Sequence, residues 1–242
     1  MRYLPATLRT PAENLALDEL LLDSYGDCLR IWESPTPLVV MGRSSAVEVE
    51  VDTAACERLG VPILRRISGG ATIVCGSGCL MYAVTLDLQN RPHLQAVDNC
   101  HREVLQPIAE ALRCHQASVH IAGTSDLAFS NAPGKLAVKF SGNSLRVTRS
   151  RLLYHGTLLY DYDTQLISEL LRTPPRRPEY RVERSHAAFV SNLPIDRETL
   201  VQALMTAWPS DSPAASITDE QQRRVAELVA GKYATDRWNL SR

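Results

Sequence analysis

Two adjacent arginines followed by a pair of glycines form the stretch with the clearest potential for chemistry. Arg65 and Arg66 come directly after an apolar run, and Ser68, Gly69 and Gly70 follow them. Glycines let the backbone approach a ligand closely, and successive N–H groups in such a loop form a concavity that binds anions. Arginine adds a fixed charge suited to phosphate or carboxylate. We therefore expect a loop that holds an anionic small molecule, although a β-hairpin turn with two solvated arginines is the alternative, because short glycine motifs are weak signals.

A lysine interrupts another apolar run. Lys139 lies in the stretch 136–140, directly before Ser141 and Gly142. Lysine is almost never buried without a partner. One interpretation is a cation directed at a carboxylate or phosphate, bound where the strand breaks at the glycine. The other is a side chain that points to solvent from an alternating strand.

Asp126 and His155 are the next candidates for a site. Asp126 follows a small-residue turn and begins a predicted strand, so its carboxylate could cap the turn or contact a ligand. His155 precedes Gly156 within another predicted strand. A lone histidine in a strand is more often a hydrogen-bonded structural residue than a catalytic base.

Cysteine thiolates could carry an acyl group during a transfer reaction. The chain has six cysteines, at 28, 56, 75, 79, 100 and 114. Cys75 and Cys79 flank a turn near the glycine loop, but no Cys/His pair at zinc spacing accompanies them, so no metal site is predicted. Cys114 and His115 are neighbours on a predicted helix and do not face each other. Most of the six are expected to be small core residues.

Composition limits the class of protein. The 242 residues suit one large domain, and the formal net charge of −1 provides no bulk field for nucleic acid or an anionic membrane. The N-terminal residues contain no apolar segment of the signal-peptide kind, and no apolar run approaches the ~18 residues that span a bilayer. Scattered cysteines are typical of a reducing compartment. We expect a cytoplasmic protein with no nucleic-acid or membrane partner.

Hydrophobic periodicity and turn residues predict the elements that must position these side chains. Strands are predicted at 3–8, 28–32, 38–41, 61–64, 72–74, 80–86, 118–122, 126–129, 136–140, 144–148 and 152–160. Helices are predicted at 11–22, 53–59, 92–116, 164–171, 197–208 and 218–233. Because the strands come in runs, the sequence predicts an α+β fold with mixed or antiparallel sheets packed against helices.

Four local features refine this plan. The strands at 72–74 and 80–86 are expected to pair antiparallel around the turn 75–79. Pro107 should kink or divide the helix 92–116. A hairpin turn is predicted at 131–134, and the next strand is expected to break at 141–143.

The C-terminal third of the sequence is predicted to differ from the rest. A helical tail begins at about residue 164, and Pro174, Pro175 and Pro178 mark an extended surface loop. We expect residues 1–242 to form a single domain with this tail.

Together the motifs resemble the lipoate–protein ligase A family of the biotin/lipoate ligase and octanoyltransferase superfamily. The matching segments are 13–18 (ENLALD), 65–70 (RRISGG), 123–127 (GTSDL), 139–144 (KFSGNS), 155–159 (HGTLL) and 232–239 (KYATDRWN). They occur in the family's order along nearly the whole chain. The resemblance implies the class II biotin/lipoate ligase-like catalytic domain, without the C-terminal accessory domain of the longer ligases.

The resemblance also implies a two-step reaction. Lipoate or octanoate reacts with ATP and Mg²⁺ to give an acyl-adenylate and pyrophosphate. A lysine of a lipoyl carrier domain then attacks the acyl-adenylate. The carrier would be the glycine cleavage H protein, a dehydrogenase E2 domain or another lipoate-bearing protein, and a separate subunit could supply the missing accessory domain.

By the same resemblance, Lys139 is the catalytic residue that neutralises the acyl carboxylate and the α-phosphate. The residues implied to bind the substrate or adenylate are Arg65, Arg66, Ser68, Gly69, Gly70, Ala71, Asp126, Ser141, Gly142, His155 and Gly156. Val74, Tyr82 and Val84 are the candidates for the acyl pocket by strand position. Ala71 stands where the family usually has a third glycine, and Thr124 where it has an arginine, so the nucleotide contacts differ from the family pattern.

Two other functions remain open. An octanoyl or lipoyl transferase would move the acyl group between carrier proteins through a cysteine thioester. Related transferases place that cysteine either in the loop before the family lysine or shortly after the lysine. Here these places are residues 123–124 and the stretch after Asn143, and neither holds a cysteine. A ligase is therefore favoured, and Cys79 is the best-placed alternative. A non-catalytic paralogue that binds lipoate or its carrier is the second alternative.

Overall fold

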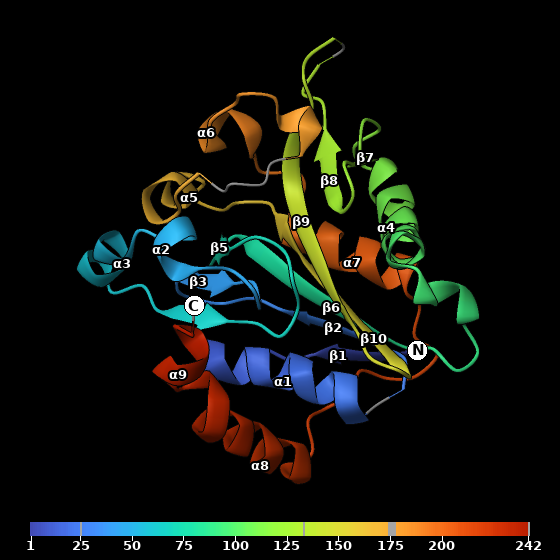
Figure 1. Cartoon of the computed structure of the whole chain (residues 1–242). Helices are drawn as coiled ribbons and strands as arrows, with labels where there is room; N and C mark the ends of the chain where they lie inside the picture. Colours follow the sequence, from blue (N-terminus) through green and yellow to red (C-terminus); the bar gives the residue numbers. More distant parts are fainter. Residues whose placement is uncertain (25, 133, 174–177, 242) are drawn as a thin grey trace.

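The computed structural model describes residues 1–24, 26–132, 134–173 and 178–241, and its strands form two sheets (Figure 1). The larger sheet has the strand order β1 (Arg2–Pro5), β2 (Cys28–Trp32), β6 (Cys79–Asp87), β10 (Arg151–Leu159), β9 (Val138–Val147), β8 (Asp126–Phe129), β7 (His120–Ala122). The smaller sheet has the order β4 (Ile63–Arg65), β3 (Leu38–Met41), β5 (Ile73–Cys75). Parallel and antiparallel pairs occur in both sheets, which confirms the predicted α+β class.

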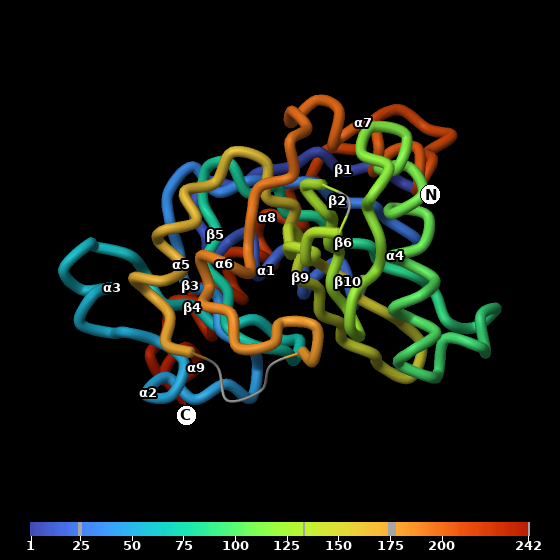
Figure 2. The backbone as a smooth tube through the Cα atoms, turned by 90° about the horizontal axis from the view of Figure 1, so that it is seen from above, coloured from blue at the N-terminus to red at the C-terminus, as the bar shows by residue number. Residues whose placement is uncertain are grey.

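Helices cover both faces of the larger sheet. Their bounds are α1 (Pro11–Ser24), α2 (Val47–Glu50), α3 (Thr53–Leu59), α4 (Val97–Arg113), α5 (Gln165–Leu170), α6 (His186–Phe189), α7 (Arg197–Ala207), α8 (Asp219–Leu228) and α9 (Asp236–Asn239). One apolar core lies between the sheet and α4 and α7, and the other lies among the sheet, α1 and the smaller sheet (Figure 1). Figure 2 shows α5 on the side of the molecule away from α4, where it contacts β5 and α6. No helix among the described residues has the length and apolarity to cross a bilayer.

Alternation along β6 explains how one strand serves both cores. Leu80, Tyr82 and Val84 belong to the core under α4, whereas Met81 and Ala83 belong to the core under α1. Successive side chains of a strand point to opposite faces, so a strand buried on both faces is apolar throughout.

The predicted hairpin around residues 75–79 is wrong. β5 pairs with β3 in the smaller sheet, whereas β6 pairs with β2 and β10 in the larger sheet. The turn therefore carries the chain from one sheet to the other. Gly78 has a φ of +84°, and a Cβ on it would lie 2.1 Å from the carbonyl oxygen of Asp161, so only glycine fits at this crossing.

The predicted strand break at residues 141–143 is also wrong. β9 runs without interruption from Val138 to Val147, but its register against β8 shifts: Ser141 pairs with Leu127, and Lys139 pairs with Ala128. Phe140 is thus the extra residue of a β-bulge. The small residues that suggested a break instead mark a bulged strand.

Other boundaries are closer to the prediction. The helix Thr53–Leu59 has the predicted bounds, with Asp52 as its N-cap and Gly60 as its C-cap. The helix α4 is not divided at Pro107. The break in helical structure lies instead at Ala96, between a 3₁₀ turn at Pro92–Gln95 and the start of α4. The predicted turn at 131–134 and the proline-rich loop lie partly outside the described residues, because they include Pro133, Pro174 and Pro175.

Candidate active site

Two adjoining cavities lie where the loop after β4 meets the strands β9 and β10. The first has a volume of about 360 Å³, with apolar side chains from α1, β3, β5 and β6 on one side and polar residues of the loops and β9 on the other. The second has a volume of about 140 Å³ and a mainly apolar lining that includes residues of α5 and α6. Residues that line both cavities are Ala71, Thr72, Ile73, Lys139, Gly142 and Pro178.

The bulge in β9 creates the centre of this site. Lys139 and Gly142 are three positions apart and would face opposite sides of a regular strand. The extra residue Phe140 puts both on the face of Asp126, which pairs with Gly142 in the register. A Cβ on Gly142 would lie 3.0 Å from the Lys139 Nζ, so the ammonium group lies over the glycine.

Lys139 is ion-paired within the site. Its Nζ lies 2.7 Å from Asp126 Oδ1, and the hydroxyl of Tyr180 donates to Asp126 Oδ2 at 2.8 Å. The side chain of Lys139 is 26% exposed and lines both cavities. Lys139 therefore does not simply point to solvent, because it lines the cavities. Asp126 binds this lysine and does more than cap a turn.

Arg66 shapes the glycine loop from inside the protein. Its guanidinium donates to the carbonyl oxygens of Val40, Gly69 and Ala71 and to the Ser68 hydroxyl. Burial lowers the pKa of Arg66 to about 10, while Glu50 opposes this, so the group stays charged at neutral pH. Because the C=O and N–H of a trans peptide point in opposite directions, this grip turns the N–H groups of Gly70 and Thr72 away from Arg66.

The loop N–H groups differ in their partners. The Thr72 N–H donates to Glu50 Oε2 at 2.8 Å. Among the described residues, the N–H groups of Gly69, Gly70 and Ala71 have no acceptor. Gly70 and Ala71 line the first cavity, which gives that cavity donors for an anion.

Arg65 was expected to offer its charge to an anion at the glycine loop, but it lies inside the protein. It is fully buried and is neither a solvated turn residue nor at the mouth of the loop. Its guanidinium donates to the carbonyl oxygens of Gly42, Ser45, Trp238 and Asn239. Arg65 therefore joins the loop to the segment around α9.

His155 connects the loop to the first helix. Its Nε2 lies 2.5 Å from Ser68 Oγ, and its Nδ1 lies 3.5 Å from Asp18 Oδ2. Arg66 Nε also donates to Ser68 Oγ, so the Ser68 hydroxyl links the arginine to the imidazole. Ser68 is fully buried, so the series of polar contacts from Asp18 through His155 to Ser68 supports the loop and does not present a nucleophile.

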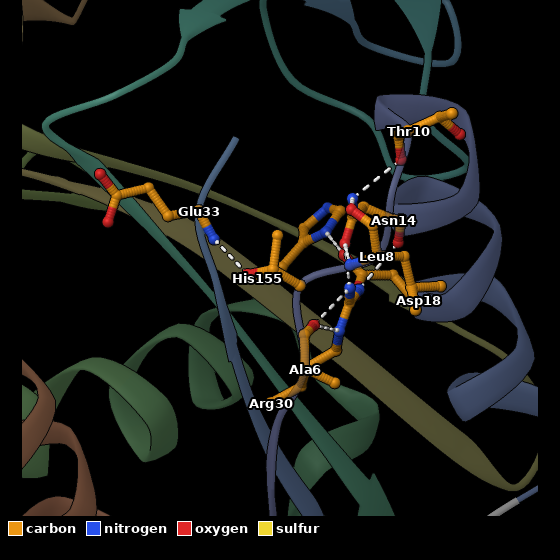
Figure 3. Close-up of polar contacts among 9 residues, drawn as sticks. Ala6, Leu8, Thr10, Asn14, Asp18, Arg30, Glu33 and His155 are labelled. Carbon is orange, nitrogen blue, oxygen red and sulfur yellow. Dashed lines mark hydrogen bonds and ion pairs between the residues drawn. The ribbon is translucent and has the colours of Figure 1, made fainter. Parts of the chain in front are cut away.

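Asp18 also pairs with a buried arginine (Figure 3). Arg30 Nη1 donates to Asp18 Oδ1, and Arg30 Nη2 donates to Asn14 Oδ1. Burial alone would raise the pKa of Asp18, but Arg30 and His155 outweigh burial and hold it below its usual value. Figure 3 shows Arg30 of β2 and His155 of β10 beside Asp18 of α1, with Asn14 on the same helix bound to Arg30.

Asn14, Asp18 and Arg30 are not among the predicted site residues, although the sequence contains a signal for them. Leu15, Asp18 and Leu22 are spaced by three and four residues, so the carboxylate lies on the apolar stripe of α1. Arg30 lies inside a strand that is buried throughout. A charge on each of two buried elements indicates an internal pair.

Asn143 closes the polar side of the first cavity. It accepts a hydrogen bond from the Tyr82 hydroxyl and donates to the Ser125 carbonyl oxygen. Gly156 makes this possible, because a Cβ there would lie 1.7 Å from Asn143 Oδ1. Ser144 donates to the Gly69 carbonyl oxygen at 2.7 Å and so ties β9 to the glycine loop.

The chain matches a known protein family over most of its length. The family model described as "Lipoyl protein ligase A/B catalytic domain" matches residues 10–208. The chain belongs to this family. It is 25% identical to octanoyltransferase LipM of Geobacillus kaustophilus, over 100% of this chain and 98% of that protein. It is 23% identical to lipoate–protein ligase 1 of Staphylococcus aureus, over 96% of this chain and 70% of that protein.

Solved structures show the same fold. A bi-partite lipoate protein ligase from Thermoplasma acidophilum, studied with its E2 lipoyl domain, has a TM-score of 0.84 at 21% identity and covers 99% of this chain and 95% of that chain. A lipoate-protein ligase A bound with ATP has a TM-score of 0.81 at 20% identity and covers 99% of this chain and 98% of that chain. These likenesses confirm the fold of a lipoyl protein ligase A/B catalytic domain.

The relatives include octanoyltransferases as well as ligases, and a transferase of the thioester type needs a reactive cysteine at its site. All six are described, and none lines either cavity. Burial raises the pKa of the Cys75 thiol to about 12, with Arg66 opposing it, and raises that of Cys79 well above its usual value. Both thiols therefore stay protonated and unreactive at neutral pH.

Most of the predicted catalytic and binding residues line one or both of the cavities. Arg66, Gly70, Asp126, His155 and Gly156 line the first cavity. Ser141 lines the second, whereas Lys139, Ala71 and Gly142 line both. Arg65, Ser68 and Gly69 line neither.

The three acyl-pocket candidates are not together. Val74 lines the second cavity, whereas Tyr82 and Val84 line neither, because their side chains lie on the α4 face of β6. The apolar residues of the first cavity are Leu15, Val40, Ile73 and Met81. Met81 comes from the opposite face of β6 and was not among the predicted acyl-pocket residues.

Proposed function

We propose that the protein is a lipoate–protein ligase that activates lipoate or octanoate with ATP and transfers the acyl group to a lysine of a lipoyl carrier domain. The observation that carries the proposal is the position of Lys139. It is a cation at the junction of two cavities, and no cysteine lines either of them. Such a junction suits a carboxylate that must meet a phosphate.

The acyl chain would occupy the apolar side of the first cavity. Leu15, Val40 and Met81 come from three different elements and supply the hydrophobic contacts. The carboxylate end would then point toward Lys139 and Gly142. The nucleotide would extend into the second cavity, past Ile73 and Val74.

In the first step, a carboxylate oxygen of the acyl substrate attacks the α-phosphorus of ATP, and pyrophosphate leaves. Two anions must approach each other in this step. The ammonium of Lys139 and the loop N–H groups of Gly70 and Ala71 would reduce their repulsion and stabilise the charge that develops. Mg²⁺ supplied with ATP would further neutralise the charge of the phosphates.

In the second step, the amine of the carrier lysine attacks the carbonyl carbon, the bond from that carbon to the phosphate oxygen breaks, and AMP leaves while the nitrogen loses a proton. A mixed anhydride is already activated, so positioning contributes most of this step. Lys139 would hold the carbonyl oxygen as it gains charge. His155 would keep the loop in place and would not transfer protons.

Two carrier reactions test this proposal by intact mass of an apo lipoyl domain. One reaction contains lipoate, ATP and Mg²⁺, and the other contains an octanoylated carrier protein without ATP. A ligase adds the lipoyl mass only in the first reaction. Modification only in the second reaction would contradict the proposal and would identify a transferase, the activity for which the Geobacillus relative is named.

The proposed reaction could also require a partner subunit. The Thermoplasma relative in the structural comparison is a bi-partite ligase. If this protein works in the same way, the first reaction needs a second polypeptide. Formation of lipoyl-adenylate and pyrophosphate from lipoate and ATP without a carrier would show that this protein activates the acid by itself.

A further inference from the structure

Thr72 stands at the junction of the two cavities and has an unusual side chain environment. It is 8% exposed and lines both cavities. Its backbone is fixed, because its N–H donates to Glu50 Oε2. Lys139 and Gly142 line the same two cavities.

The hydroxyl of Thr72 lacks a hydrogen-bond partner among the described residues. A buried hydroxyl without a partner is destabilising, because it gives up hydrogen bonds with water and gains none. Three other buried polar atoms share this condition, in Trp32, Tyr162 and Trp208, but none of those residues lines either cavity. Within the described ranges, Thr72 is therefore the one such residue at the site.

The position of the hydroxyl limits the ligand that could bind it. Lys139 supplies a positive charge at the same junction, so an anionic oxygen is favoured there over a donor group. The hydroxyl oxygen is buried in the structure, and a change of side-chain rotamer, which exchanges the hydroxyl and the methyl of threonine between staggered positions, would bring it to a ligand. A hydroxyl donates one hydrogen bond, and a phosphoryl oxygen accepts it well.

We propose that Thr72 is a further binding residue, whose hydroxyl donates to an oxygen at the acyl–phosphate link of the bound acyl-adenylate. The inference rests on the proposed function, because it assumes that the acyl and nucleotide parts meet at this junction. Binding of the adenylate then satisfies a hydroxyl that folding leaves unsatisfied.

Two substitutions separate this role from a structural one. Thr72→Val keeps the shape and removes the hydroxyl, and Thr72→Ser keeps the hydroxyl and removes the methyl. The probe is octanoyl-sulfamoyladenosine, a stable analogue of the adenylate, and its affinity is measured by calorimetry. We expect Thr72→Val to bind it about 10-fold more weakly, and Thr72→Ser to recover most of the affinity.

Thermal unfolding without ligand provides the second readout. Thr72→Val should unfold at the same temperature as the wild type or higher, because it removes an unsatisfied buried hydroxyl. Equal affinity of Thr72→Val and the wild type would overturn the inference. A lower unfolding temperature with unchanged affinity would overturn it as well, since the hydroxyl would then have a structural partner.

The same experiment distinguishes failure of the inference from failure of the proposed function. A wild-type protein that does not bind the analogue refutes an adenylate site and the inference with it. A wild-type protein that binds the analogue but never modifies a carrier refutes the ligase function alone. In that case the ratio of affinities between the two variants still decides the role of Thr72.

Discussion

At the scale of single residues, the site depends on charges that are paired before any substrate arrives. Lys139 binds Asp126, and Asp126 also accepts from Tyr180. Deeper in the protein, Asp18 is held between Arg30 and His155. The first pair borders the cavities and can exchange partners with an anionic ligand, whereas the second is buried and fixed.

Removal of the Lys139 charge tests the first pair. We expect Lys139→Met to lower the rate of carrier acylation by about 100-fold or more, because a preorganised cation stabilises charge in the transition state. Folding should persist, since Asp126 keeps the hydrogen bond from Tyr180. Lys135→Met, at an exposed position before β9, is the matched control and should keep its activity. Near-normal turnover of folded Lys139→Met would remove the central assignment.

Replacement of Asp18 tests the second pair through pH. The pKa of Asp18 is below its unfolded value, so its contribution to stability is present above about pH 4 and is lost as the pH falls through the folded pKa. We expect Asp18→Asn to lower the free energy of unfolding by about 3 kcal/mol at pH 7, because Arg30 loses its buried counter-charge. Urea unfolding from pH 7 to pH 3 measures the difference.

The difference between wild type and Asp18→Asn should shrink toward acid pH. A constant difference across the range would contradict the pairing of a charged Asp18. Glu57→Gln removes a negative charge from an exposed position of α3 and is the control for charge alone.

At the scale of elements, the glycine loop is supported by the turn that follows β3. A Cβ on Gly42 would lie 1.9 Å from the carbonyl oxygen of Gly70, which is a backbone atom and cannot rotate away. Ser45 Oγ also lies 3.4 Å from this oxygen. The loop and the turn are therefore in direct backbone contact.

This contact predicts a large effect from one methyl group. Gly42→Ala should displace the loop by about 1 Å or more and lower activity by about 100-fold, since catalysis is sensitive to misplacement on this scale. Gly231→Ala is the control, because no heavy atom lies within 4 Å of its Cβ position. Kinetics and thermal unfolding of both variants check this. Wild-type activity of Gly42→Ala would show that the loop position does not limit the reaction.

The elements themselves could be predicted from the sequence better than their arrangement. The helix Thr53–Leu59 follows from local signals, since Asp52 caps it and Gly60 ends it. The bulge at Phe140 could not be predicted, because it depends on the register against β8. The separation of β5 and β6 into two sheets is likewise a tertiary choice, since both strands are apolar and fit either sheet. The family resemblance identified Lys139, but only the bulge explains its position.

At the scale of the whole molecule, the distribution of thiols gives a further test. Cys114 is exposed, and the other five cysteines are buried. We expect one thiol per native chain to react rapidly with a disulfide reagent, and all six to react after unfolding. Acylation activity should survive alkylation of the native protein, because no cysteine lines the cavities. Loss of activity on alkylation would favour a thioester mechanism.

The hydrogen bonds around Arg65 have a consequence for how the protein is made. Its backbone N–H and carbonyl bind the side chains of Asn239 and Trp238, 174 and 173 positions later in the sequence. Ribosomes add about 5–20 residues per second, so these partners emerge about 9–35 s after Arg65 does. During that interval, the strand that leads into the glycine loop has an open edge in the nascent chain. A competent anion site is therefore one of the last features to form during synthesis, and chaperones have time to bind the open edge before it closes.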